Sequence, residues 1–146
     1  MIFFLNSVLE AAVRQIAIAR DIDLTIHTGT YGTMNLADVN GKQRPFYLAQ
    51  DKNNNGVVPV PKYFWKLIHD PSSETATAVI GINNPHLERI TSSDILCPDV
   101  CNQVSWIATL RWKPHDFSKG YMFCCTAQSL HKAVSYAPDL DLPLFL

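Results

Sequence analysis

The hydrophobic positions near the start of the chain follow a helical period. Leu9, Val13 and Ile16 recur at spacings of three and four, while Glu10 and Arg14 fall on other faces. This pattern predicts an amphipathic helix that begins after Asn6. The run Ser7-Val8-Leu9-Glu10 fits a capping box, in which the Ser7 hydroxyl and the Glu10 carboxylate satisfy first-turn amides.

The pattern then changes to strands. Alternation begins at Asp23 and leads into an expected turn at Thr28-Gly29-Thr30-Tyr31-Gly32. Asn40-Gly41 predicts a tight hairpin whose second strand, because it holds Pro45, lies at an edge or a bulge. Residues 57–61 and 63–68 are further strand candidates, residues 76–82 are apolar enough for a central strand, and residues 124–136 could form a second helix that Pro138 ends.

These elements predict one α+β domain over residues 1–146, with a mostly antiparallel sheet packed by one or two helices. The chain has 146 residues, 47% apolar and 17% charged, which is typical of a packed domain and not of a disordered chain. Its formal net charge of −1 means that any site for a polyanion must be local.

The opening apolar run, Met1-Ile2-Phe3-Phe4-Leu5, has no basic segment and no cleavage site, so it does not predict an export signal. We interpret it instead as what a chain cut from within a core strand would show. No stretch is apolar over the ~20 residues that a membrane-spanning helix needs. We therefore expect no membrane contact.

Four cysteines gather in the last third of the chain, at Cys97, Cys101, Cys124 and Cys125. Adjacent cysteines diverge and suit zinc poorly, and they bridge each other only with strain. We therefore expect two disulfides that join Cys97 and Cys101 to Cys124 and Cys125, in either of the two possible pairings. Disulfides imply an oxidising compartment and hence a secreted parent protein.

Three segments in order resemble one known family: Leu9-Glu10 with Arg14, then Thr28-Gly29-Thr30-Tyr31-Gly32, and then the run from Val58 to Lys66, Val-Pro-Val-Pro-Lys-Tyr-Phe-Trp-Lys. Together they resemble the C-terminal half of the DNA/RNA non-specific endonucleases, the Mg-dependent nucleases with a ββα-metal site. The later Asn83-Asn84-Pro85-His86 and Cys97-Pro98-Asp99-Val100-Cys101 are similar to the secreted arthropod branch, which includes double-stranded RNA nucleases. The resemblance implies hydrolysis of phosphodiester bonds in DNA or RNA.

In that family an Asp-Arg-Gly-His motif supplies the general base, and the next helix supplies an Asn metal ligand, a Glu in the metal's water shell and an Arg for the phosphate. By the resemblance, Glu10 and Arg14 take the last two roles as catalytic residues, with Mg as the cofactor. No Asp-Arg-Gly-His occurs in the chain, and Ile2 stands where the family keeps its Asn. Asn6 is a weak substitute as metal ligand, since it precedes the expected cap.

Each candidate also has a plainer explanation. Glu10 could be only a capping residue, and Arg14 its salt-bridge partner one turn on. Lys62, Lys66 and Arg44, in a basic stretch with Lys42 and Lys52, could bind nucleic acid or simply solubilise strand edges.

Three functions therefore remain open. The chain could be part of an endonuclease that is inactive alone, a catalytically dead nucleic-acid-binding module, or a disulfide-stapled structural domain. Because a chain that begins inside a ββα motif leaves sheet edges uncovered, self-association is also expected.

Overall fold

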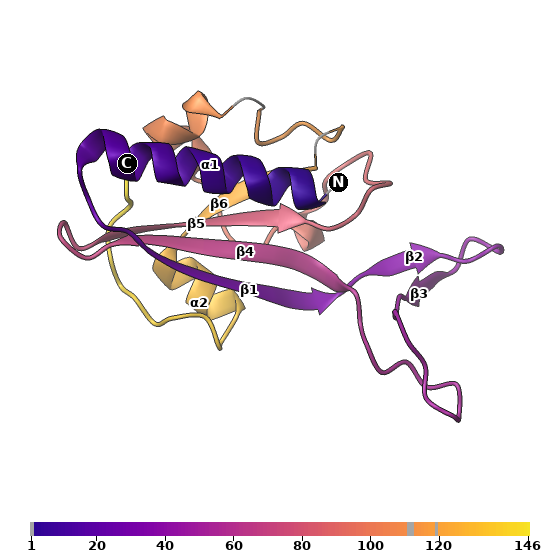
Figure 1. Ribbon diagram of the computed structural model, residues 1–146. Coiled ribbons are helices and arrows are strands. Elements are labelled where there is room, and N and C mark those ends of the chain that lie inside the picture. The colour runs from indigo at the N-terminus through magenta and orange to yellow at the C-terminus, as the bar shows by residue number, and fades with distance from the viewer. Residues whose placement is uncertain (1, 111–112, 119) are drawn as a thin grey trace.

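A computed structural model shows a four-stranded antiparallel sheet between two layers of helices and loops (Figure 1). It describes residues 2–110, 113–118 and 120–146, with side chains described from residue 7 onward. The strand order is β1-β4-β5-β6, so the expected central strand is indeed internal. This confirms the predicted α+β class. None of the described helices is long and apolar enough to cross a membrane.

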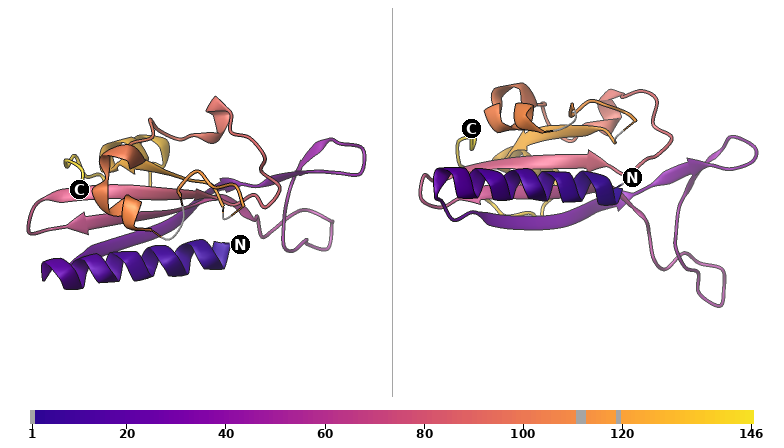
Figure 2. Two further views of the ribbon diagram at one scale, coloured as in Figure 1. Left: turned by 90° about the horizontal axis from the view of Figure 1, so that it is seen from above. Right: turned by 45° about the horizontal axis from the view of Figure 1, so that its top comes forward.

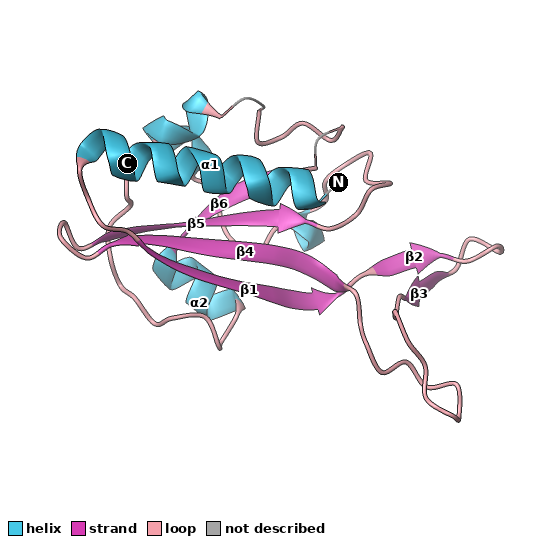
Figure 3. Ribbon diagram, viewed as in Figure 1, coloured by secondary structure: helices cyan, strands magenta, loops and turns pink. Residues whose placement is uncertain are grey.

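Figure 3 shows the elements by type. The helices are α1 (Ile2–Arg20) and α2 (Ala127–Ala133), with short 3-10 turns at η1 (Ser92–Asp94), η2 (Cys101–Gln103) and η3 (Ser105–Thr109). The sheet strands are β1 (Thr25–Thr33), β4 (Pro61–Asp70), β5 (Thr75–Ile82) and β6 (Met122–Thr126), and a separate hairpin is formed by β2 (Asn35–Ala37) and β3 (Gln43–Pro45).

Alternate residues of the sheet build two cores. Ile68 and Val79 face α1, η2 and η3, and pack with Leu9 and Val13 of the helix. Their sequence neighbours face α2, where Leu67 is fully buried and the side chains of Tyr63 and Trp65 also lie in the core. The strand period of two therefore gives each face of the sheet its own hydrophobic cluster.

The start of α1 corrects the sequence analysis. The helix begins at Ile2, so residues 2–5 are not part of a core strand. Ser7 lies in the second turn, where its backbone already belongs to the helix, so the predicted capping box at Ser7 and Glu10 is wrong. An all-apolar run shows no polar face, which is why its period could not reveal a helix.

The expected turn at residues 28–32 is also wrong, because these residues continue β1. A Cβ atom added at Gly29 would lie 2.4 Å from Cζ2 of Trp65. The two residues are partners across β1 and β4. Glycine is therefore required here for close approach to an aromatic ring and not to reverse the chain.

The Asn40-Gly41 hairpin is confirmed. It joins β2 to β3, Gly41 has a φ of +78°, and Pro45 ends β3. The second helix is shorter than predicted, because Cys124 and Cys125 lie on β6 and α2 begins only at Ala127. A strand directs the two cysteines to opposite faces, which the disulfides require.

Candidate functional site

A cleft of about 340 Å³ lies between α1 and the β1 side of the sheet. Its walls combine charged and aliphatic side chains. They come from Glu10, Val13, Arg14, Ala17, Ile22, Asp23, Leu24, Ile26 and Lys66. The structure thus brings the candidate catalytic residues Glu10 and Arg14 into one cleft with Lys66, which lies 52 positions after Arg14 in the sequence.

The helix and the strand position these groups by their own periods. Glu10 and Arg14 are one turn apart on α1 and lie on the same side of the helix, next to the buried Leu9 and Val13. Lys66 precedes Ile68 by two positions on β4, so both side chains point toward α1. These three charged groups are therefore carried by a helix and a strand of the core, while the loop between α1 and β1 adds Asp23 to the lining.

A hydrogen bond within the cleft joins the helix to the sheet. Lys66 Nζ donates a hydrogen bond to Glu10 Oε1 at 3.0 Å. The Lys66 side chain is only 12% exposed, whereas that of Glu10 is 56% exposed. The partner of Glu10 seen in the structure is thus Lys66, and not the Arg14 that helical spacing suggests.

The other two candidate cations also lie against carboxylates. Lys62 Nζ is 3.2 Å from Asp94 Oδ1, and Arg44 Nε is 3.2 Å from Asp38 Oδ2. Partial burial lowers the pKa of Lys62, but its contacts with Tyr63 and Asp94 outweigh this and leave that pKa raised, so the amine is charged. Arg44 is 61% exposed and keeps its outer guanidinium nitrogens available.

The structure of the C-terminal third shows how the four cysteines pair. The disulfides are Cys97–Cys125 and Cys101–Cys124, which selects one of the two expected pairings. Asp99, Cys101 and Cys124 lie close enough together to hold a metal ion. The second disulfide uses both of these sulfur atoms, so they are not available as metal ligands. The side chain of Asn6, the weak metal candidate, lies outside the described residues.

The sequence analysis missed one polar cluster beside these disulfides. Asp99 Oδ1 accepts hydrogen bonds from the amides of Cys101 and Cys124, at 2.9 and 3.0 Å. Its other oxygen lies 2.6 Å from Nε2 of His115, whose ring stacks on Tyr121. In the sequence, the position of Asp99 between Cys97 and Cys101 could have indicated a polar cluster beside the disulfides. Nothing in the sequence indicates that the distant His115 belongs to it.

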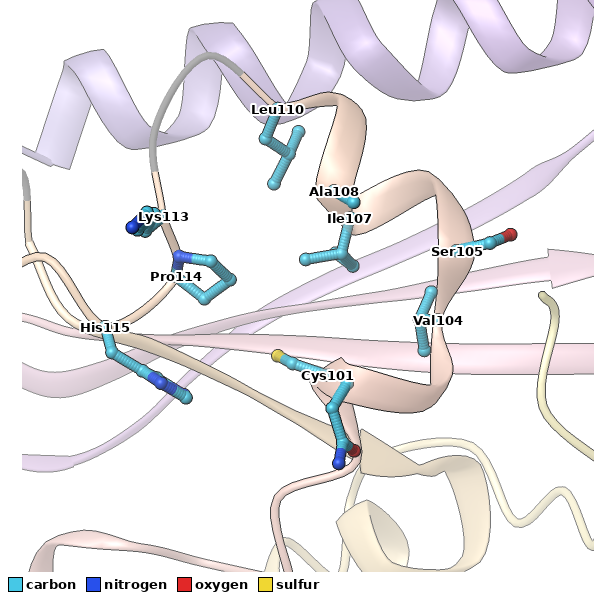
Figure 4. A pocket seen from close by; sticks show the side chains of 10 residues that line it. Cys101, Val104, Ser105, Ile107, Ala108, Leu110, Lys113, Pro114 and His115 are labelled. Carbon is cyan, nitrogen blue, oxygen red and sulfur yellow. The ribbon is translucent and has the colours of Figure 1, made fainter.

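Figure 4 shows a second cleft, of about 500 Å³, where His115 and Lys113 face η2 and η3. The lining from η3 and from Leu110 directly after it is mostly apolar, with Ile107 and Leu110 buried. No carboxylate is among the residues that line this cleft, whereas the first cleft combines two carboxylates with two cations. The cleft of Glu10 is therefore the better candidate for chemistry on a charged substrate.

Comparison with known proteins identifies the family of this chain. A family model described as DNA/RNA non-specific endonuclease matches residues 7–130. The chain is 26% identical over 135 residues to "Salivary protein Tsal1" of Glossina morsitans morsitans, covering 92% of this chain and 32% of that protein. It is 29% identical over 124 residues to "Salivary endonuclease" of Lutzomyia longipalpis, covering 85% and 28%.

The chain thus spans about a third of the length of these curated relatives. No solved structure gives a significant match. The family match covers both candidate catalytic residues, the cleft and the disulfides, and it agrees with the resemblance carried by the motifs. On this basis the chain belongs to the DNA/RNA non-specific endonuclease family.

Proposed function

We propose that this chain supplies the helix-borne part of the active site of a Mg-dependent nuclease that hydrolyses phosphodiester bonds of DNA, RNA or both. One observation carries the proposal: Glu10, Arg14 and Lys66 line the same cleft. By resemblance to the family, Glu10 holds the metal's water shell and Arg14 meets the phosphate. Both side chains are exposed on one side of α1, as these roles require.

The donor set of the cleft fits the metal that the family uses. Mg²⁺ prefers oxygen ligands, keeps several waters and binds through one or two carboxylates. The carboxylates that line the cleft are those of Glu10 and Asp23. When bound, Mg²⁺ would supply Lewis-acid stabilisation of the phosphate and lower the pKa of a water.

The remaining residues act on the substrate by charge. The exposed guanidinium of Arg14 would stabilise negative charge that develops on the phosphate. Lys62 and Arg44 would contact the nucleic-acid backbone further along, and Lys66 would hold the Glu10 carboxylate in place. The 146 residues contain no Asp-Arg-Gly-His, so we propose that this chain alone binds nucleic acid but does not cleave it.

The same reasoning extends to the setting of the protein. Two disulfides favour an oxidising compartment, and the relatives named above are salivary proteins. We propose that the natural protein is secreted. Because β1 is an edge strand of the sheet with much of its length exposed, self-association of the isolated chain remains part of the proposal.

A direct test measures both binding and cleavage. The purified chain is incubated with Mg²⁺ and either plasmid DNA or double-stranded RNA, and its affinity for a labelled duplex is measured by fluorescence anisotropy. We expect binding without cleavage, and a several-fold loss of affinity in Arg14→Gln. Arg89→Gln, at an exposed arginine that does not line the cleft, is the matched control and should leave affinity unchanged. Equal losses in both variants would contradict the assignment of the cleft.

The catalytic part of the proposal is tested in the natural transcript. An in-frame Asp-Arg-Gly-His upstream of Met1 would supply the missing base, and Glu10→Gln in that longer protein should then lower hydrolysis at least ~100-fold. A stop codon upstream would instead favour the second candidate function, a nucleic-acid-binding module without activity. Mg-dependent cleavage by the 146-residue chain that survives Glu10→Gln would overturn the assignment of Glu10.

A further inference from the structure

Residues 34–60 form an arm that leaves the end of the main sheet after β1 and returns to it at β4. Figures 1 and 2 show the arm projecting away from the body in every view. Every residue from 39 to 59 is exposed, whereas Met34 and Val60 at its base are buried. The arm therefore has no core of its own and presents its side chains on both faces.

Hydrogen bonds nonetheless hold the arm in one shape. The Leu48 amide donates to the Val58 carbonyl at 2.7 Å, and the Val57 amide donates to the Ala49 carbonyl at 3.0 Å. A Cβ at Gly56 would overlap the ring of Tyr47 at 2.3 Å, so that ring packs directly against the backbone of the returning segment. An ordered arm loses less entropy when it binds than a loose loop would.

The two acidic residues of the arm are occupied by its own turns. Asp38 accepts hydrogen bonds from the amides of Lys42 and Asn40, and these donors lower the pKa of its carboxyl. Asp51 accepts from the side chain and amide of Asn55 and the amide of Asn53, which likewise lower its pKa. Both carboxylates are thus ionised and locked inward as parts of the turns.

Of the three cations of the arm, Arg44 lies against Asp38, but the two lysines are not occupied in this way. Lys42 lies at the tip closed by Asp38, and Lys52 lies at the tip closed by Asp51. Neither ammonium group forms an ion pair within the described part of the chain. Exposed aromatic and aliphatic side chains stand between the two tips, with Phe46 41% and Leu48 73% exposed. Exposed apolar groups of this kind mark interaction surfaces.

The arm also continues the line of the cleft. Lys66 and Lys62 are four residues apart on β4, so their backbones lie ~13 Å apart along the strand. The ammonium of Lys62 turns toward Asp94 and the ring of Tyr63, at the end of the strand next to the arm. From Lys62 the strand leads directly to the base of the arm, and the arm carries Arg44 and Lys42 further in that direction (Figure 1). A polyanion that enters the cleft would meet cations along this path.

We propose that the arm is a second nucleic-acid contact, in which Lys42 and Lys52 bind phosphates of the strand whose scissile bond lies in the cleft. The inference rests on the proposed function, since it assumes a nucleic-acid substrate. Charge decides the occupant: the acids of the arm are tied to its own amides, and its unpaired ionic groups are cations that complement phosphate. The exposed aromatic side chains offer faces on which bases can stack.

The test compares Lys42→Gln/Lys52→Gln with Lys132→Gln, a control at an exposed lysine on α2. Affinity for a labelled DNA or RNA duplex is measured at several salt concentrations. Each lost phosphate contact should make the plot of log affinity against log salt shallower by ~0.9, so the double variant should lose ~1.8 in slope and at least ~10-fold in affinity near 0.1 M salt. The control should match the unmodified chain.

The outcomes separate the arm from the cleft. A chain that binds, with a double variant unchanged in affinity and slope, would overturn the arm while leaving the proposed function intact. A chain that binds no duplex would overturn both. Sedimentation of Leu48→Ser provides the remaining outcome. A dimer that this substitution dissociates, together with a duplex affinity that the double lysine variant does not change, would overturn the proposal and assign the arm to contact with a second copy. An unchanged thermal midpoint for each variant would show that the fold is intact.

Discussion

The ion pair between Lys66 and Glu10 should contribute measurably to stability, unlike an ordinary surface pair. The two groups are 3.0 Å apart, and Lys66 is only 12% exposed. At an effective dielectric constant near 20, unit charges at ~4 Å attract by ~4 kcal/mol before desolvation and side-chain entropy are subtracted. Because Glu10 is 56% exposed and screened by water, we expect a net coupling of about 1 kcal/mol.

A double-mutant cycle measures this coupling. Glu10→Gln should destabilise the fold by about 1 kcal/mol, because it leaves the mostly buried side chain of Lys66 without a counter-charge. Lys66→Met should cost little, since it keeps the apolar stem and lets Glu10 return to water. Adding Glu10→Gln to Lys66→Met should then have almost no effect. The free energy of unfolding in urea gives each value.

The pair of Arg44 and Asp38 is the matched control. It has a similar distance, 3.2 Å, but Arg44 is 61% exposed, so its coupling should be below ~0.3 kcal/mol. Salt provides a second check, because a partly buried pair is screened less than an exposed one. Additive effects of Glu10→Gln and Lys66→Met would refute the argument and would leave Glu10 free to move in the cleft.

Three further predictions concern the scaffold. Gly29→Ala should lower the free energy of unfolding by about 1–3 kcal/mol, because the added Cβ would overlap the ring of Trp65. Replacing Cys101 and Cys124 by serine should cost about 3 kcal/mol in urea unfolding, because their bridge closes a separation of 23 residues. Hydrogen bonds from neighbouring serines lower the pKa of Asp70 to about 2, so thermal stability should fall as pH drops from about 4 toward 2, and Asp70→Asn should flatten that profile.

Much of the fold could be predicted because its signals are local. The hairpin at Asn40-Gly41 depends on two adjacent residues, and the central strand at residues 76–82 depends on an apolar run. The errors arose where distant residues decide. Gly29 lies within a strand because the ring of Trp65, 36 positions away, occupies the space that a side chain at position 29 would need. Cys124 and Cys125 stay in a strand because their disulfide partners lie on opposite faces of the sheet.

The candidate site was predictable to the same extent. Helical spacing alone places Glu10 and Arg14 on one side of α1, and the structure agrees. The pairing of Glu10 with Lys66 joins residues 56 positions apart, and no local rule relates them. Asp99 and His115 are a similar case, since a hydrogen bond across 16 residues leaves no periodic trace.

The pairing of cations with carboxylates separates two roles that the sequence analysis had joined. In the sequence, Lys62, Lys66 and Arg44 look equivalent as phosphate ligands. In the structure Lys66 is only 12% exposed and bonded to Glu10, so a phosphate could recruit it only by breaking that contact. Exposed Arg14 and the unpaired lysines of the arm carry no such cost. We therefore expect affinity to depend on the exposed cations and hydrolysis on Glu10, so that loss of the catalytic base would abolish cleavage and leave binding intact.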